Sequence, residues 1–121
     1  MFDRRRPGGR ILTLDGYPHR GQPIMLTEFG GISFQARAEP GVKKIWGYTT
    51  AKDEEEFARI YEDIVDTIIH TALFSGFCYT QFADTFQEAN GLLYADRTPK
   101  VPLERIAAVT KRSRTHIPGA A

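Results

Sequence analysis

A single carboxylate, Glu28, stands between an apolar segment and a pair of glycines. The stretch is PIMLTEFGG, residues 23–31. A carboxylate fixed at the end of a buried strand can act as a nucleophile or as a general base. Glycines next to it allow a sharp turn and the close approach of a ligand. A structural acid, satisfied by backbone groups or by an arginine, explains the same residue equally well.

The other residue types that could do chemistry form no recognisable pattern. His19, His70 and His116 are too far apart to show metal-ligand spacing, and no glycine-rich phosphate loop is present. No metal and no cofactor are therefore expected. The one cysteine, Cys78, lies in the apolar run GFCYTQF. It is expected to be a buried small hydrophobe and not a nucleophile.

Aromatic side chains gather in the segments around Glu28 and Cys78. Ligand sites are commonly lined by aromatic groups, and the apolar faces of sugars suit them. For Phe29 and Phe82, packing in the core is the favoured explanation. The aromatic residues of these segments are Phe29, Trp46, Tyr48, Tyr79 and Phe82.

The elements that must position these residues alternate between strand and helix. Consecutive apolar residues predict a strand over 23–28 that is buried on both faces, and a second such strand over 76–82. Helices are predicted over 53–74 and 102–113, while 32–52 shows no period and is predicted to be a long loop. This alternation predicts an α/β fold with a parallel sheet.

The first predicted helix has the clearest pattern. Asp53 or Thr50 can cap its start, three acids at 54–56 suit its positive end, and Gly76 suits its stop. His70 falls off the apolar stripe and is expected on the surface. Apolar residues recur at steps of three and four: Phe57, Ile60, Tyr61, Ile64, Val65, Ile68 and Ala72.

Glu28 and Gln81 stand at corresponding places in the two predicted strands. Each lies at the carboxyl end of its strand, before a polar loop. In parallel α/β folds, ligands bind beyond the carboxyl ends of the strands. The two side chains are therefore expected to lie at the same edge of the sheet.

The composition is that of a folded domain and excludes several functions. The 121 residues are 41% hydrophobic and 26% charged, with a net charge of +1, which gives no field that would attract nucleic acid. The basic clusters at 4–10 and 111–114 are expected to be solvated ends. No apolar run is long enough for a membrane span or a signal peptide, which favours a cytoplasmic protein. The expected organisation is an arm over 1–19, a folded region over 20–113 and a tail over 114–121.

Three stretches, PIMLTEFGG, WGY and GFCYTQFADTFQEANGLLYADRTPK, resemble the C-terminal part of the catalytic barrel of glycoside hydrolase family 2. This family contains β-galactosidases, β-glucuronidases and β-mannosidases, and the resemblance runs from about residue 20 to about residue 105. It implies a partial TIM barrel, in which the two predicted strands and helices are the seventh and eighth of the (β/α)8 fold.

The resemblance also implies roles for individual residues. Glu28 would be the nucleophile of a retaining β-glycosidase that hydrolyses β-galactoside- or β-glucuronide-type substrates by double displacement. Trp46 would lie in the loop over the sugar, and Tyr79 and Gln81 would bind substrate near the end of the eighth strand. Many family members carry tryptophan at the position of Thr80.

Retaining hydrolysis requires a second carboxyl group about 5–5.5 Å from the nucleophile. The resemblance implies that this acid/base glutamate belongs to the fourth barrel strand, upstream of Met1. Asp84 and Glu88 are the local candidates for a substitute. The chain is thus expected to be a fragment, inactive alone, whose partners are a carbohydrate, the rest of the barrel and further copies that cover its open strand edges. The alternative is a non-catalytic domain that binds carbohydrate or protein.

Overall fold

The structure, a computed structural model, describes residues 13–36, 47–85 and 87–112. It confirms an α/β fold with parallel strands and two helices, and the described residues form no closed barrel. Trp46 and the basic cluster at 4–10 lie outside the described residues. The elements in chain order are β1 (Met25–Gly30), β2 (Ile32–Ser33), β3 (Thr49–Thr50), α1 (Glu54–Ile69), β4 (Gly76–Thr80) and α2 (Leu103–Thr110).

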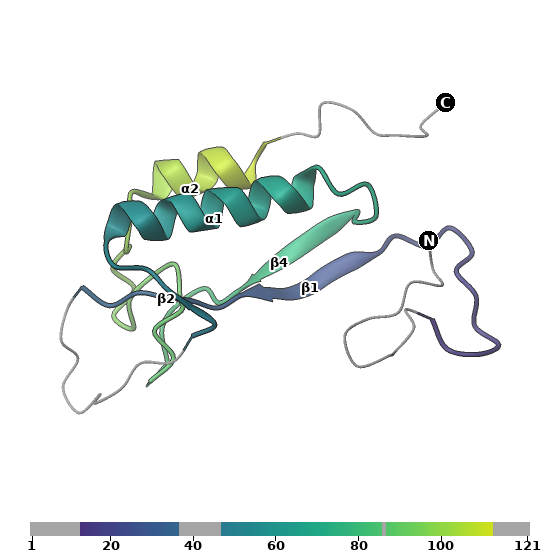
Figure 1. Cartoon of the computed structure of the whole chain (residues 1–121), viewed down its shortest axis with the longest axis horizontal. Coiled ribbons are helices and arrows are strands. Elements are labelled where there is room, and N and C mark those ends of the chain that lie inside the picture. Colours follow the sequence, from purple (N-terminus) through teal and green to yellow (C-terminus); the bar gives the residue numbers. More distant parts are fainter. Residues whose placement is uncertain (1–12, 37–46, 86, 113–121) are drawn as a thin grey trace.

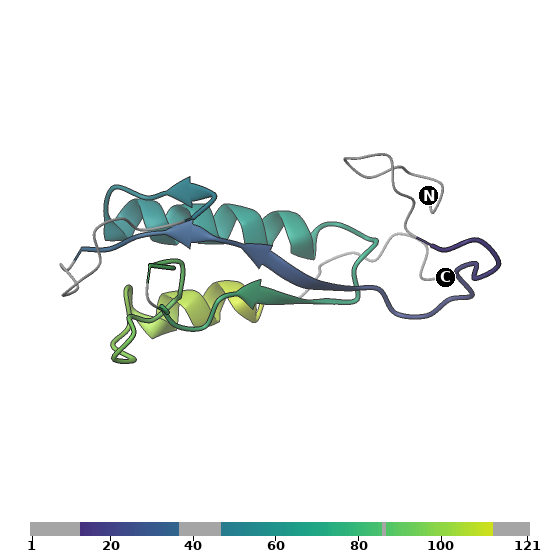
Figure 2. The ribbon, with the colours of Figure 1, turned by 90° about the horizontal axis from the view of Figure 1, so that it is seen from below.

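The strands form two small parallel sheets. β1 pairs with β4, and β2 pairs with β3. Both helices lie on the same side of the β1–β4 pair, as Figures 1 and 2 show. No described helix covers the opposite face of this pair, so the molecule has one packed face and one open face.

The apolar stripe of α1 was predicted correctly except for its last member, Ala72, which is exposed and lies beyond the end of the helix. The start of the helix is well defined. Asp53 caps the helix by accepting a hydrogen bond at Oδ1 from the Glu56 amide at 2.8 Å. Phe57, Tyr61 and Val65 are buried almost completely. The cap stabilises the helix through a local hydrogen bond, and the apolar stripe stabilises it through tertiary packing.

α1 ends at Ile69, about one turn before the predicted end at residue 74. Three polar side chains near this end bond to the carbonyls four residues earlier: Thr67 Oγ1 to Asp63 at 2.7 Å, His70 Nδ1 to Asp66 at 2.8 Å and Thr71 Oγ1 to Thr67 at 2.7 Å. Such side chains compete with the helical ladder and have low helix propensity. The stop signal is therefore this polar cluster. Gly76 instead begins β4.

The core lies between the helices and the strands. Phe57 and Tyr61 of α1 meet Ile32 and Phe34 from the segment after β1, and Val109 comes from α2. The helix α2 begins at Leu103, one residue later than predicted, and ends at Thr110, before the predicted residue 113. At this end Tyr61 Oη and Thr110 Oγ1 lie 2.8 Å apart in a hydrogen bond that joins the two helices.

Three expectations of burial were wrong. β1 was expected to be buried on both faces, but Met25 is 51% exposed; Cys78 is exposed, and Phe82 is 69% exposed. All three lie on or beside a sheet that helices cover on one side only. An apolar run predicts burial on both faces only when both faces have a covering layer.

The segment 32–52 is not the structureless loop that was predicted. Its two ends return to each other as β2 and β3, and the Ala51 amide donates to the Ser33 carbonyl at 2.9 Å. Residues 37–46 between them lie outside the described part of the chain. The return of the chain brings Tyr48 beside Gly31.

No helix in the described residues has both the length and the apolar character needed to cross a bilayer.

Candidate functional site

A hollow of about 510 Å³ lies at the carboxyl ends of β1 and β4. It takes its walls from β1, from the return of the chain at Tyr48 and from the loop after β4. Its lining residues are Glu28, Phe29, Gly30, Gly31, Tyr48, Thr80, Glu88 and Asn90. The structure therefore brings Glu28 together with a second carboxylate, an aromatic ring and an amide.

Glu28 was expected at the end of its strand, but it is the fourth of six residues in β1. The β1–β4 register shifts at this point: Leu26 pairs with Phe77, and Phe29 pairs with Tyr79. β1 therefore uses one residue more than β4 between the two pairs, which is the count of a β-bulge.

The bulge explains how Glu28 reaches the open side. In a regular strand, residues two apart share a face, so Glu28 would lie beside Leu26. Leu26 and Phe29 instead both line a groove against Ile64 and Ile68 of α1, while Glu28 is exposed. The extra residue thus aims the carboxylate away from the helices and into the hollow. No sequence signal pointed to this irregularity.

The glycine pair after Glu28 has a structural reason that differs from the expected one. Gly30 and Gly31 have φ of 112° and 71°, a region that favours glycine. A Cβ at Gly30 would overlap the ring of Tyr79, and one at Gly31 would overlap the ring of Tyr48. The chain runs from β1 into β2 across these glycines without the predicted sharp turn, and the space beside them is taken by two aromatic rings of the chain itself.

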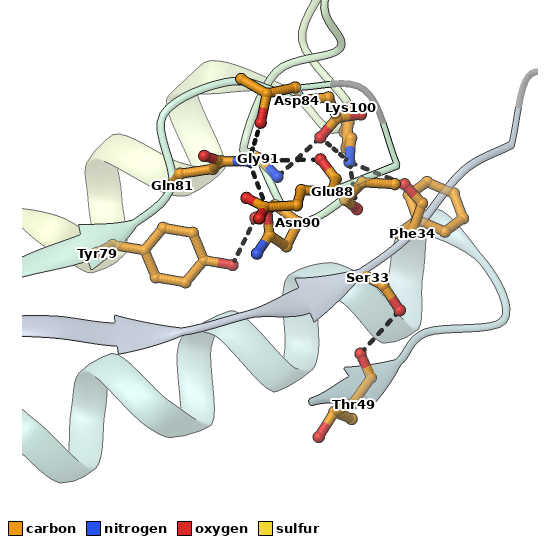
Figure 3. A network of polar contacts seen from close by, with 12 residues as sticks. Ser33, Phe34, Thr49, Tyr79, Gln81, Asp84, Glu88, Asn90, Gly91 and Lys100 are labelled. Atoms are coloured by element: carbon orange, nitrogen blue, oxygen red, sulfur yellow. Dashed lines mark hydrogen bonds and ion pairs between the residues drawn. The ribbon is translucent and has the colours of Figure 1, made fainter. Parts of the chain in front are cut away.

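A buried cation holds the loop after β4 (Figure 3). The side chain of Lys100 has no exposed surface. Its Nζ donates to Asp84 Oδ1 at 2.7 Å, to the Phe34 carbonyl at 2.8 Å and to the Ala89 carbonyl at 2.9 Å. All three ammonium protons thus have acceptors, which is what a buried charge requires.

Asp84 completes this network. Its Oδ1 also accepts a hydrogen bond from the Gly91 amide at 2.8 Å. Burial lowers the pKa of Lys100, and the Asp84 carboxylate opposes that shift. Because Asp84 is buried in this ion pair and does not line the hollow, its geometry gives it a structural role and not that of a substitute acid.

Gln81 and Tyr79, both predicted to bind substrate, form hydrogen bonds with Asn90. Gln81 Nε2 donates to Asn90 Oδ1 at 2.6 Å, and Tyr79 Oη donates to the Asn90 carbonyl at 3.4 Å. The ring of Tyr79 packs edge-on against Phe29 and Tyr61, and burial raises the pKa of its hydroxyl. Neither side chain lines the hollow; both support a residue that does.

Sequence reasoning missed Asn90 and Lys100. An Asn-Gly pair usually signals a turn, and a lysine between proline and valine usually signals the surface. Only the long-range contact of Lys100 with Phe34, 66 positions earlier, reveals its role. Among the described residues, no three side chains of His, Cys, Asp or Glu gather so that they could hold a metal ion.

Neither a scan against models of protein families nor a search of curated proteins finds a match for this chain. The likeness to family 2 glycosidases therefore stays a prediction from the short motifs quoted above.

Proposed function

We propose that this chain forms part of the sugar site of a retaining β-glycosidase, with Glu28 as the nucleophile. The observation that carries the proposal is the bulge in β1, which presents an exposed carboxylate to a hollow at the carboxyl end of parallel strands. Bulges occur preferentially beside active sites, where they re-aim a side chain. The ring of Tyr48 and the amide of Asn90 give the hollow groups suited to a sugar.

The chemistry assigned to Glu28 is the first half of a double displacement. A carboxylate oxygen attacks the anomeric carbon, the bond from that carbon to the leaving oxygen breaks, and a glycosyl ester forms. An acid must protonate the leaving oxygen, and water then cleaves the ester. Glu88 lines the same hollow, but the family resemblance favours an acid from another barrel strand, so the chain alone is expected to lack full turnover.

The open face of the sheet supports placing residues 20–113 as the last two βα units of a TIM barrel. Among the described residues, β1 and β4 pair only with each other, and the grooves on both flanks of this pair are apolar. Unpaired edges and apolar grooves favour association with further strands. The chain alone is therefore expected to self-associate, and a stable monomer in sedimentation experiments at low micromolar concentration would count against this arrangement.

The nucleophile can be tested without the missing acid. A 2,4-dinitrophenyl 2-deoxy-2-fluoro-β-glycoside releases a phenolate that needs no protonation, and its fluorine slows hydrolysis of the ester. Intact mass should rise by one fluoroglycosyl group, located by digestion in the peptide that carries Glu28. Galactoside, glucoside, mannoside and glucuronide probes would be compared.

Two variants control this experiment. Glu28→Gln should abolish labelling, whereas Glu88→Gln, in the same hollow, should retain it. Absence of labelling with all four sugars, or labelling that persists in Glu28→Gln, would refute the assignment.

A non-catalytic domain that binds carbohydrate or protein is the second candidate. It is favoured by the locked state of Asp84, which leaves Glu88 as the only other acid in the described lining of the hollow. In that case methyl β-glycosides should shift the NMR signals of Tyr48 and Asn90 equally in the natural chain and in Glu28→Gln, with no labelling by the fluorinated probes.

A further inference from the structure

We infer that Lys100 is a positioning residue of the hollow, because it ties the hollow's two walls together from behind. One wall follows β1 through Gly31 and continues to Phe34. The other wall is the loop after β4, which carries Glu88 and Asn90. The functional part of this inference rests on the proposed glycosidase site, and its structural part does not.

The joint between the walls consists of three hydrogen bonds. Lys100 Nζ donates to the Phe34 carbonyl at 2.8 Å and to the Ala89 carbonyl at 2.9 Å. The Phe34 amide donates to the same Ala89 carbonyl at 2.9 Å. Ala89 lies between the two lining residues Glu88 and Asn90, so its carbonyl fixes the backbone that carries both side chains.

The surroundings of Lys100 make it irreplaceable by water. The side chain has no exposed surface, and Nζ lies 5.7 Å from the ring centre of Phe57 and 5.5 Å from that of Tyr94. Cations at such distances from aromatic faces are attracted to them. In the described part of the chain, Lys100 is the one side chain that donates to both the Phe34 and the Ala89 carbonyls.

Removal of the ammonium group should therefore leave the Ala89 carbonyl with the Phe34 amide as its only remaining donor of the joint and loosen the placement of Glu88 and Asn90. Lys100 itself does not line the hollow. Its effect on the chemistry acts through the two residues that do, which is what distinguishes a positioning residue from one that touches substrate.

The first test measures labelling by the dinitrophenyl fluoroglycoside that reacts best with the natural chain. In Lys100→Met, the rate constant of labelling in the folded fraction should fall by about tenfold or more, because small displacements of positioning groups are costly. Lys100→Gln, which keeps a shorter donor, should give an intermediate rate. Val109→Ala, in the core away from the hollow, should lower the amount of folded, reactive protein but not the rate constant of labelling in the folded fraction.

A rate constant for Lys100→Met equal to that of Val109→Ala would overturn the functional role. Absence of labelling in the natural chain would refute the glycosidase proposal and leave the second test decisive.

The second test measures amide hydrogen exchange without any ligand. In Lys100→Met, the amides of Phe34 and Gly91 should exchange faster, by a factor at least about ten times larger than the change at Val65 in α1, because local opening releases only the joined walls. Equal acceleration at all three positions would show global destabilisation alone and overturn the inference.

Discussion

Two groups of ion pairs, one buried and one at the surface, differ in how far water can reach them. Lys100 and Asp84 form a pair whose side chains are 0% and 6% exposed. Arg105 joins Glu55 at 2.6 Å and Glu62 at 2.7 Å, but the Glu55 side chain is 76% exposed. Both groups link segments far apart in the sequence.

A short distance between two charged groups does not measure how much the pair contributes to stability. The Arg105 bonds are as short as those of Lys100, yet water competes for every group in them. The Lys100–Asp84 pair is shielded from solvent, so the removal of one partner leaves a lone buried charge. The buried pair should control both stability and the shape of the hollow, and the surface group should control neither.

The largest expected effect is that of Lys100→Met. Leaving the Asp84 carboxylate buried and unpaired should destabilise the fold by about 3–5 kcal/mol, measured by urea denaturation. Asp84→Asn combined with Lys100→Met should recover part of this loss, because no lone charge remains and the asparagine oxygen can still accept from Gly91. If Lys100→Met alone is as stable as the natural chain, the buried pair and the surface ion pairs do not differ in their contribution to stability.

Gly91→Ala should have the next largest effect. A Cβ at this position would overlap the backbone of Ala83 and Asp84, which cannot move as a side chain could. Overpacking of this kind typically costs about 1–3 kcal/mol. Gly91 does not have a positive φ, so the clash alone should account for this loss, whereas Gly16→Ala, with φ of 80° and no atom within 4 Å, measures backbone strain without a clash. A Gly91→Ala variant as stable as the natural chain would show that the backbone of Ala83 and Asp84 can move aside without cost.

Asp53→Ala tests the surface region through its helix cap. Loss of the hydrogen bond to the Glu56 amide should cost about 1 kcal/mol, read from the thermal unfolding midpoint. Asp53→Asn should restore most of the stability, since asparagine caps equally well. If the alanine and asparagine variants have the same unfolding midpoint, the cap hydrogen bond contributes nothing to stability. The cap would then have no larger effect than the Arg105 ion pairs.

Arg105→Gln should have the smallest effect on stability at neutral pH. The Arg105 guanidinium lowers the pKa of the Glu55 carboxyl below its ordinary value of 4.5. Such a group contributes stability above its unfolded pKa and loses it as the pH falls through the lowered folded pKa. The difference between the natural chain and Arg105→Gln should therefore shrink below pH 4.5 and should also shrink in high salt. A large loss at pH 7 would contradict the surface assignment.

The sequence was informative wherever a pattern was local. The stripe of α1, its Asp53 cap and the parallel βα order follow from periodicity and from side-chain chemistry within a few residues. The end of α1 was missed because three polar side chains, each unremarkable alone, act together. The exposure of Met25, Cys78 and Phe82 could not be predicted, since burial depends on whether another layer covers the sheet.

The candidate site was predicted only in part, because some of its features depend on local patterns and others on distant contacts. Glu28 was identified from its place between an apolar run and two glycines, and it does line the hollow. Its aim depends on the register with a strand 50 positions away, which no local pattern encodes. Lys100 was invisible because its hydrogen-bond partners come from two other segments, one with Phe34 and one with Asp84 and Ala89. Trp46 lies outside the described residues, so its predicted role stays a prediction.

The bulge in β1 also bears on the kinds of mutation that the chain can accept. Deletion of Thr27 would leave the same number of residues in β1 and in β4 between the Leu26–Phe77 pair and the Phe29–Tyr79 pair. The two strands could then pair without interruption. A strand shaped by stability alone would gain from this loss. Folding does not require the extra residue. Its loss would shorten the chain by one residue, which a substitution cannot do.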